Sequence, residues 1–203
     1  MSKPRGSLIV YSGPSGVGKG TIIAPLIKDT IFALSVSATT RAPRAGEIEG
    51  QSYYFLSRDR FEQMIKENQF LEYAQYNGNY YGTPREFVEQ KLDAGIDVLL
   101  EIEVVGAMKV KQSFPEAVFI FVMPPSYEEL RPRLIGRQTE TAQQIHNRLA
   151  AARDEIKMAE QYDFIIINND LAAARENLLA AVRAGKLLTR KNYNFIKEVE
   201  KLC

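Results

Sequence analysis

Residues 13–21, Gly13-Pro14-Ser15-Gly16-Val17-Gly18-Lys19-Gly20-Thr21, decide the fold of this chain. They follow the apolar run Leu8-Ile9-Val10-Tyr11 and precede the helix-like apolar segment 22–27. A strand, a glycine-rich turn and a helix in this order are typical of a phosphate-binding P-loop. The glycines let the backbone wrap with its N–H groups pointing inward, because glycine tolerates positive φ. A turn that binds nothing is the alternative, but the spacing and context favour a nucleotide site in which Lys19 contacts the β- and γ-phosphates.

The position after Lys19 departs from the usual P-loop pattern. A serine or threonine usually binds Mg²⁺ there through its hydroxyl, whereas this chain has Gly20, with Thr21 one residue later. In a helix Thr21 is rotated by roughly 100° from position 20, so we do not expect it to point at the same spot. Mg²⁺ keeps several waters and often takes few protein ligands. We therefore predict no direct protein ligand for the ion, and Glu101 as the candidate to hold one of its waters.

The composition is that of a globular protein, with 45% hydrophobic and 25% charged residues. Lys and Arg total 26 against 25 acidic residues, so no basic excess indicates a nucleic-acid partner. The only cysteine, Cys203, cannot form an internal disulfide, which favours the cytoplasm. No apolar run approaches the ~20 residues that a membrane span needs. One cysteine and one histidine, His146, argue against a structural zinc site, and we expect His146 on the surface.

Strand and helix patterns alternate along the chain. Apolar runs predict strands at 7–12, 32–37, 53–56, 96–103, 117–122 and 164–167. Helical patterns predict a first helix from the P-loop to about residue 28, and further helices at 58–68, 83–95, 107–114, 141–161 and 171–183. Another begins at 126 and ends before a predicted loop at 136–140. Pro25 should kink the first helix or end it early, because proline removes a backbone donor.

Local motifs predict where several of these elements begin and end. Ser57 and Ser126 precede helices as N-caps, and Gly95 should end one. Thr83-Pro84-Arg85-Glu86 has the form of a capping box with proline at the first helical position. Asn77-Gly78 predicts a β-hairpin of strands 70–76 and 79–82, and the turn-rich segment 39–47 predicts a loop.

This order predicts an α/β fold in which a parallel P-loop sheet is wrapped by helices. A strand-rich insertion at about 36–83 should form a small lobe that leans over the P-loop. Carboxylates at 101 and 103 end one predicted strand, at the sheet edge where ligands bind in open α/β folds.

The insertion carries residues suited to a second phosphate group. Arg41 and Arg44 lie in its loop, and Tyr53 and Tyr81 flank the neighbouring strands. Guanidinium groups match phosphate geometry bidentately. For an isolated loop we would favour solvated charges, but a P-loop in the same chain favours phosphate binding.

Glu72 is surrounded in sequence by Phe70, Leu71, Tyr73 and Ala74. One carboxylate can accept from both N1–H and N2–H₂ of guanine, whereas adenine has an acceptor at N1 and nothing at C2. Hairpin periodicity alone leaves an exposed strand position as an equal alternative.

Four motifs together resemble the guanylate kinase family. They are Ser12–Lys19, Ser37–Glu47 (Ser-Ala-Thr-Thr-Arg-Ala-Pro-Arg-Ala-Gly-Glu), Gly78–Thr83 (Gly-Asn-Tyr-Tyr-Gly-Thr), and Tyr162-Asp163-Phe164 with Asn168. The resemblance covers residues 7–184. It implies the reaction ATP + GMP ⇌ ADP + GDP with Mg²⁺, on a core at about 7–35, 84–125 and 160–185, a GMP-binding lobe at about 36–83 and a helical lid at about 126–159.

The resemblance also implies roles for individual residues. Four residues match family positions that contact guanine: Ser37, Glu72, Thr83 and Glu103. Four others match positions that hold the GMP phosphate: Arg41, Arg44, Tyr53 and Tyr81. Three arginines match the family's lid and core arginines that contact the ATP phosphates and the transferring group: Arg133, Arg137 and Arg148. Together with Lys19 and Arg41 they are the expected catalytic residues. Asn168 matches a position near adenine, and residues 13–21 bind the ATP phosphates.

Two other classes of function remain as alternatives. The first is a guanylate-kinase-like protein-binding module that has lost catalysis, although such modules generally have degraded P-loops and Lys19 is intact here. The second is a kinase of neighbouring specificity, because Gly20-Thr21 resembles the adenylate kinase loop. The motifs at 37–47 and 78–83 argue against that assignment.

Overall fold

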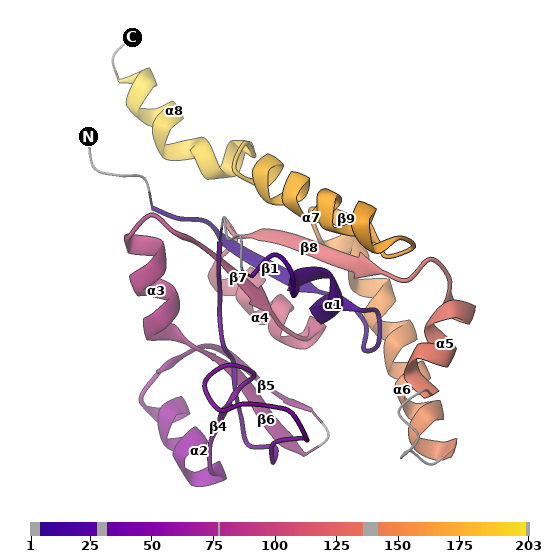
Figure 1. The fold of residues 1–203 in the computed structure, drawn as a ribbon. Helices are drawn as coiled ribbons and strands as arrows, with labels where there is room; N and C mark the ends of the chain where they lie inside the picture. Colours follow the sequence, from indigo (N-terminus) through magenta and orange to yellow (C-terminus); the bar gives the residue numbers. More distant parts are fainter. Residues whose placement is uncertain (1–4, 28–31, 77, 136–141, 202–203) are drawn as a thin grey trace.

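The computed structural model describes residues 5–27, 32–76, 78–135 and 142–201. It has a core sheet of five strands, a smaller sheet of four strands that forms a separate lobe, and helices around both (Figure 1). The predicted α/β fold with a helix-wrapped parallel sheet is therefore confirmed.

The core sheet has the order β2-β7-β1-β8-β9, and every neighbouring pair in it is parallel. Its strands are β1 (Leu8–Ser12), β2 (Phe32–Leu34), β7 (Asp97–Glu101), β8 (Val118–Met123) and β9 (Phe164–Ile167). Nearly all of their side chains are apolar, as expected for parallel strands covered on both faces. The β1 strand lies in the middle, so the P-loop that follows it leaves the centre of the sheet edge.

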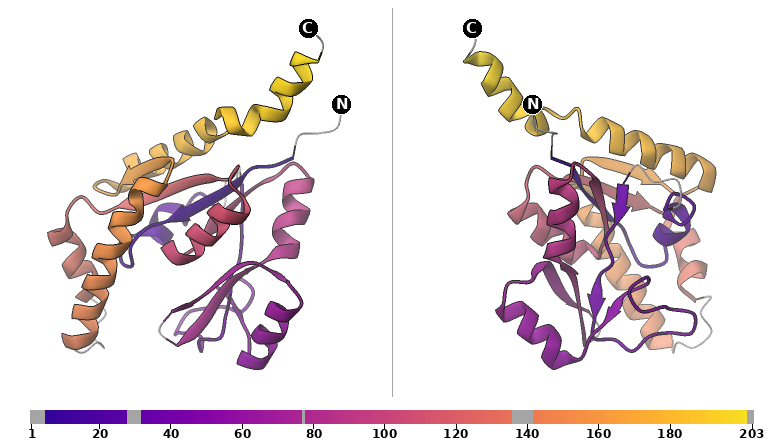
Figure 2. Two further views of the ribbon diagram at one scale, coloured as in Figure 1. Left: turned by 180° about the vertical axis from the view of Figure 1, so that it is seen from behind. Right: turned by 60° about the vertical axis from the view of Figure 1, so that its left-hand side comes forward.

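Helices cover the two faces of this sheet (Figures 1 and 2). Alternate residues of β1 show the two layers: Ile9 packs with α1 (Lys19–Ile23) and α7 (Leu171–Gly185), whereas Val10 packs with α3 (Arg85–Asp93) and α4 (Val104–Ser113). The α3 helix ends as its sequence predicts. Gly95 has a φ of 74°, and the N–H groups of Gly95 and Ile96 donate to the carbonyls of Leu92 and Lys91 in a Schellman motif.

The predicted strand-rich insertion forms the second sheet. Its order is β4-β3-β6-β5, with β3 (Ala38–Thr39), β4 (Tyr54–Phe55), β5 (Phe70–Tyr76) and β6 (Asn79–Pro84). Phe61 of α2 (Arg58–Lys66) anchors the helix, because its ring stacks on Phe70 and Tyr80 with centroids 4.3 and 5.1 Å away. In Figure 1 this lobe lies below the core sheet, next to α3 and α4.

Two helices form the opposite wall of the molecule, α5 (Tyr127–Ile135) and α6 (Ala142–Lys157), and a 3₁₀ turn (Met158–Gln161) follows α6. The predicted cap of α5 is present, since the Ser126 hydroxyl accepts from the N–H of Glu129 at 3.2 Å. The buried side chains of Leu130 and Ala152 join both helices to the core.

The chain ends in a 3₁₀ turn (Thr189–Asn192) and α8 (Tyr193–Glu200), which points away from the body (Figure 2). His146 is exposed, as expected. No helix in the described part of the chain is long and apolar enough to cross a bilayer.

Several predicted boundaries are wrong. The helix after the P-loop ends at Ile23 rather than at about residue 28, which confirms the early end expected from Pro25. The β2 strand stops at Leu34 because the chain then leaves for the lobe sheet. The α4 helix begins at Val104 rather than at residue 107, so Val104 and Val105 belong to its first turn. The predicted loop at 136–140 lies outside the described residues.

The predicted capping box at Thr83 is also wrong. The residue that precedes α3 is Pro84, and no side chain caps the helix. Thr83 is instead a strand residue paired with Glu72 across the hairpin, and its hydroxyl donates to the Glu72 carboxylate at 2.8 Å. The hairpin register thus directs Thr83 to Glu72.

Candidate active site

The P-loop connects β1 to α1 with glycines at its tight points. Gly18, at the N-terminal end of α1, has a φ of 96°, which only glycine adopts easily. A Cβ on Gly13 would lie 2.5 Å from the carbonyl oxygen of Val122, so any larger residue would push the loop off β8. The Lys19 ammonium donates to the carbonyl oxygens of Gly13 and Pro14 at 2.7 and 3.3 Å. The Lys19 side chain is therefore folded over its own loop.

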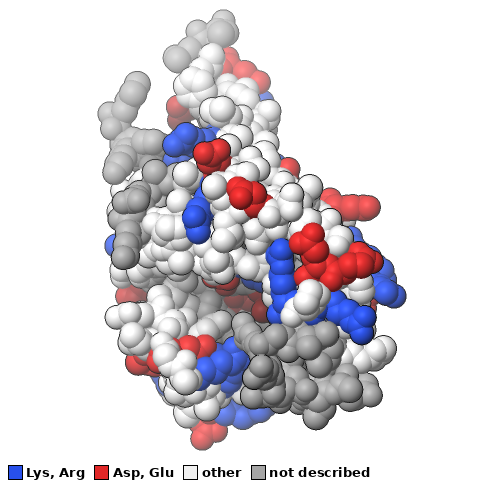
Figure 3. All heavy atoms as spheres, turned by 45° about the vertical axis from the view of Figure 1, so that its right-hand side comes forward, with Lys and Arg blue, Asp and Glu red and all other residues white. Residues whose placement is uncertain are grey.

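A cavity of about 630 Å³ opens beside this loop, between the core, the lobe and the two helices of the opposite wall. The P-loop supplies Lys19, the lobe supplies Arg41 and Arg44, and α5 and α6 supply Arg133 and Arg148. These cations come from four separate parts of the sequence and line one hollow. The predicted Arg137 lies outside the described residues. The space-filling view shows the hollow between core and lobe, with acidic side chains inside it (Figure 3).

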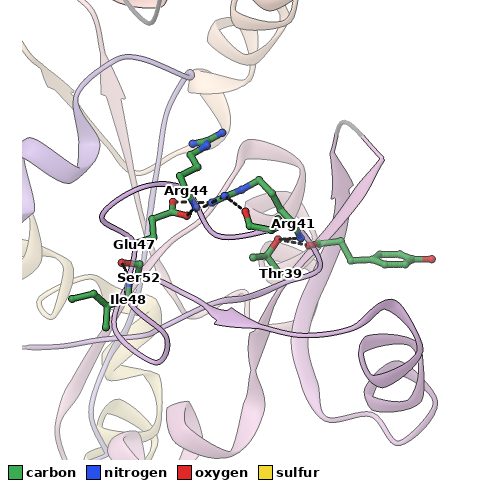
Figure 4. Close-up of polar contacts among 8 residues, drawn as sticks. Thr39, Arg41, Arg44, Glu47, Ile48 and Ser52 are labelled. Atoms are coloured by element: carbon green, nitrogen blue, oxygen red, sulfur yellow. Dashed lines mark hydrogen bonds and ion pairs between the residues drawn. The ribbon is translucent and has the colours of Figure 1, made fainter. Parts of the chain in front are cut away.

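Arg41 is held by a carboxylate that the sequence analysis did not single out (Figure 4). Its two terminal nitrogens donate to the two oxygens of Glu47 at 2.8 and 3.0 Å, and the Arg44 N–H donates to Glu47 at 2.7 Å. The side chains of Arg41 and Glu47 are only 14% and 19% exposed. The Arg41 guanidinium holds the pKa of Glu47 below its usual range. Glu47 thus fixes the loop that carries both arginines, while the Arg44 side chain points away from it (Figure 4).

The two tyrosines predicted beside these arginines lie against Arg41. Its guanidinium carbon is 5.5 Å from the centre of the Tyr53 ring, and Tyr53 meets Tyr81 edge to face at 6.1 Å. Burial, with the nearby Glu101 charge, raises the pKa of Tyr53 to about 12. Its hydroxyl therefore stays protonated at neutral pH and can donate to an anion.

Helix α6 reaches the P-loop through two residues that are two helical turns apart. Arg148 donates to the Ser15 hydroxyl at 3.0 Å. Glu155 lies near the Ser15 amide, and burial raises the pKa of its carboxyl to about 7, with the Glu103 charge adding to the rise. The seven-residue spacing of Arg148 and Glu155 could have revealed this shared face in the sequence, but Glu155 was missed. Arg133, on α5, pairs with Glu129 at 3.3 Å.

A second, narrower cavity of about 250 Å³ extends from the hollow into the space between the lobe and α4. Of the residues predicted to contact guanine, Ser37, Glu72 and Glu103 line it. Glu72 is 7% exposed and accepts from Thr83, which is fully buried. The alternative of an exposed strand position for Glu72 is therefore wrong. Burial raises the pKa of its carboxyl to about 7, against the opposing effects of the Thr83 hydroxyl and the Lys109 charge.

The two cavities form one continuous site. Both are lined by Lys19, Tyr53, Tyr76, Tyr81, Glu101 and Glu103. The Glu72 end is enclosed by the lobe and α4, and the other end is ringed by the P-loop and the arginines. This arrangement suits a nucleotide with its base at one end and its phosphate toward Lys19.

Asn168 lies behind the P-loop, at the end of β9. Its side-chain amide donates to the carbonyl oxygen of Val17 at 2.7 Å, and the residue is 5% exposed. A Cβ on Gly18 would lie 2.6 Å from the same nitrogen. In this structure Asn168 thus supports the turn of the loop, and its predicted place near adenine stays a prediction.

The metal-binding expectation is compatible with the residues around Gly20. A Cβ on Gly20 would lie 3.9 Å from an oxygen of Glu101, so that carboxylate points to the place where a P-loop hydroxyl usually stands. Burial raises the pKa of Glu101, while Lys19 opposes the rise. Among the described residues, no group of three or more His, Cys, Asp or Glu side chains could hold a metal ion.

Comparison with known proteins gives a consistent result. The family model described as guanylate kinase matches residues 5–185. A guanylate kinase of Halalkalibacterium halodurans is 52% identical over 204 residues, covering 98% of this chain and all of that protein. One of Bacillus subtilis is 50% identical, with 98% and 100% of the two chains covered. The crystal structure of guanylate kinase from Anaplasma phagocytophilum aligns with a TM-score of 0.78 at 37% identity, over 94% of this chain and 92% of that one.

Proposed function

The chain belongs to the guanylate kinase family, and on that premise we propose that it moves the γ-phosphoryl group of ATP to GMP, giving ADP and GDP. The observation that carries the proposal is the continuity of the two cavities, with a buried carboxylate at one end and the P-loop with four arginines at the other. A nucleoside monophosphate fits the narrow end, and a triphosphate fits the P-loop.

Glu72 is the base-reading residue in this proposal. Its carboxylate accepts from N1–H and N2–H₂ of guanine, while Thr83 keeps the side chain in place. A buried acceptor left without a donor is costly, so bases that lack these two donors are rejected. AMP and UMP are poor acceptors for this reason.

Phosphate groups are held by the cations of the hollow. Arg41, Arg44 and the tyrosine hydroxyls bind the GMP phosphate, and the P-loop amides with Lys19 bind the ATP phosphates. An oxygen of GMP forms the new bond to the γ-phosphorus as the bond from that phosphorus to the ADP oxygen breaks. Lys19, Arg133 and Arg148 stabilise the charge that moves during this transfer, because phosphoryl transfer depends mainly on positioning and charge neutralisation.

We propose Mg²⁺ as the divalent ion that accompanies ATP, where it neutralises phosphate oxygens. With Gly20 after Lys19, the ATP oxygens and waters would hold the ion, and Glu101 would bind one of those waters. The substrates and the single cysteine both favour a cytoplasmic location. No nucleic acid or membrane is part of the proposed activity.

A coupled assay of ADP release, run with GMP, AMP, UMP and no acceptor, tests the proposal. We expect release to depend on GMP, with the other acceptors near the background rate. Equal rates with all three nucleotides would refute guanine selectivity, and no GMP-dependent release would favour the inactive binding module.

A substitution of Glu72 tests the assignment of the base site. Glu72→Gln keeps the shape but sets an N–H₂ group against one guanine donor. We expect kcat/KM for GMP to fall about 10- to 100-fold, corresponding to ~1–3 kcal/mol, with ATP binding unchanged. If ATP binding falls equally, Glu72 has a structural role and the base lies elsewhere.

A further inference from the structure

The N-terminal part of α4 lies directly against the Glu72 carboxylate. A Cβ on Gly106 would be 2.6 Å from one Glu72 oxygen and 3.2 Å from the carboxyl carbon. Real Cβ atoms do not come this close to an oxygen, so any side chain at 106 would displace the carboxylate. Gly106 is buried and lines the same narrow cavity as Glu72.

The other Glu72 oxygen is fixed from the opposite side. It accepts from the Thr83 hydroxyl at 2.8 Å, and Thr83 is paired with Glu72 across the hairpin. The carboxylate is therefore held between a hydroxyl on β6 and a bare stretch of helix on α4. A carboxylate pinned at one oxygen can respond to a new side chain only by turning its other oxygen away.

Lys109 lies one helical turn after Gly106, and its side chain reaches β5, the strand that carries Glu72. Its ammonium donates to the carbonyl oxygen of Tyr73 at 2.5 Å and lies 4.8 Å from the centre of the Tyr73 ring. Tyr73 is the residue after Glu72 on β5. Lys109 thus ties α4 to β5 beside Glu72, and its positive charge opposes the rise in the pKa of that carboxyl.

We propose that Gly106 and Lys109 of α4 are positioning residues for guanine recognition: Gly106 leaves the space that both Glu72 oxygens need to face the base, and Lys109 ties the helix to β5 and places a positive charge beside that carboxylate. The inference rests on the proposed function, and it assigns a specificity role to one face of a core helix. Neither residue lines the larger hollow beside the P-loop, so we expect ATP use to be independent of both.

Other titratable groups near Glu72 are the same in wild type and variants. Those that line its cavity are Lys19 on α1, Tyr53, Tyr76 on β5, Tyr81 on β6, Glu101 on β7, Glu103 before α4, and Glu155 on α6. The burial of Glu72 raises its pKa to about 7, and Lys109 opposes that rise. Loss of the lysine charge therefore moves the pKa further upward.

Gly106→Ala tests the space at the helix, with GMP and IMP as paired acceptors. IMP lacks the 2-amino group, so it offers one donor where GMP offers two. We expect kcat/KM for GMP to fall about 10-fold or more and that for IMP to fall less than about threefold, with the KM for ATP unchanged. Alanine is a better helix former than glycine, so a general loss of helix stability is not the expected cause.

A double-mutant cycle with Glu72→Gln separates an effect through Glu72 from simple blocking of the pocket. In the Glu72→Gln background, Gly106→Ala should cause less than about a threefold further loss with GMP, because the contact that it disturbs is already damaged. Equal losses for GMP and IMP, or full additivity of the two substitutions, would overturn the role of Gly106.

Lys109→Gln tests the charge, with Lys109→Arg and Lys111→Gln as controls. Lys111 lies on the same helix but donates to the carbonyl of Gln161, away from Glu72. We expect the acidic limb of kcat/KM for GMP, near pH 7 in the wild type, to move upward by about half a pH unit in Lys109→Gln alone. GMP also titrates near pH 6, but its ionisation is common to all variants.

An unmoved limb in Lys109→Gln, or an equal movement in Lys111→Gln, would overturn the role of Lys109. The wild-type assay separates these failures from failure of the proposed function. If the wild type lacks GMP-dependent ADP release, both proposals are wrong. If the wild type is active but the variants behave in the overturning ways given above, only the role of α4 is refuted.

Discussion

The base pocket and the phosphate hollow are built in different ways. In the pocket, Glu72 is buried and already hydrogen-bonded to Thr83, within about 250 Å³ of enclosed space. In the hollow, of about 630 Å³, Lys19 is bound to carbonyls of its own loop and Arg133 pairs with a surface glutamate. We therefore expect the base pocket to be preformed for guanine, and the cations on the ATP side to exchange these partners for phosphates.

Arg41 lies between these two cases. It belongs to the phosphate hollow, yet Glu47 holds it bidentately and the pair is largely buried. The loop that carries Arg41 is therefore already fixed by an ion pair, and we expect rearrangement on substrate binding to be concentrated on the ATP side. This contrast predicts that substitutions on the ATP side reduce kcat and those on the GMP side raise KM for GMP.

Lys19→Met should give the largest effect. The lysine neutralises charge that moves in the transition state, so we expect kcat to fall about 10²- to 10³-fold. Methionine has similar length, and thermal unfolding should show an intact fold. Near-wild-type turnover with an unchanged KM would remove Lys19 from the reaction and with it the contrast between the two sides.

Glu47→Gln should give a smaller and different effect. The amide can accept one hydrogen bond from Arg41 but loses the charge and the second acceptor, so the guanidinium is less restrained. We expect KM for GMP to rise about 3- to 10-fold, with KM for ATP unchanged. The matched control is Glu49→Gln in the same loop, where the carboxylate accepts from the Phe55 N–H.

The direction of the pH dependence follows from the same pair. Because Arg41 lowers the pKa of Glu47, the pair is intact at neutral pH and its stabilising effect is lost only as the pH falls through that lowered pKa. A variant with equal rises in both KM values would show that Glu47 supports the whole molecule rather than the GMP side.

The sequence predicts the parts of the site that depend on local pattern. The P-loop, the hairpin and the alternation of strands and helices follow from glycine spacing and periodicity, and the structure contains all three. Arg41 and Arg44 were predicted to bind a phosphate because guanidinium groups match phosphate geometry and a P-loop lies in the same chain.

The parts that sequence reasoning missed depend on contacts between distant segments. Thr83 matches a helix cap locally, but its partner is set by hairpin register. Gly106 lies just before the helix predicted at 107–114, and only the packing of α4 on β5 brings it to Glu72. Glu47 lies within a quoted motif, but nothing in its spacing identifies a bidentate partner for Arg41.

The smallest expected effect concerns the metal response on the ATP side. A side chain fits at Gly20, because its Cβ would be at an ordinary contact distance of 3.9 Å from the Glu101 oxygen. Gly20→Ser therefore places a hydroxyl beside Glu101 without a clash. We expect activity that is equal or modestly higher, and half-maximal rate at a lower Mg²⁺ concentration.

Variants of Thr21 and Glu101 test which of the two residues determines the Mg²⁺ response. Thr21 is one helical position further on, rotated by roughly 100°, so Thr21→Ala should cost less than about tenfold. Glu101→Gln removes the buried charge nearest to position 20 and should raise the required Mg²⁺ concentration more than Thr21→Ala does. A Mg²⁺ titration of the three variants at fixed ATP measures all of these effects together. If Thr21→Ala alone abolishes the metal response, Thr21 is a direct ligand, and the ATP side is then as preformed for its ion as the base pocket is for guanine.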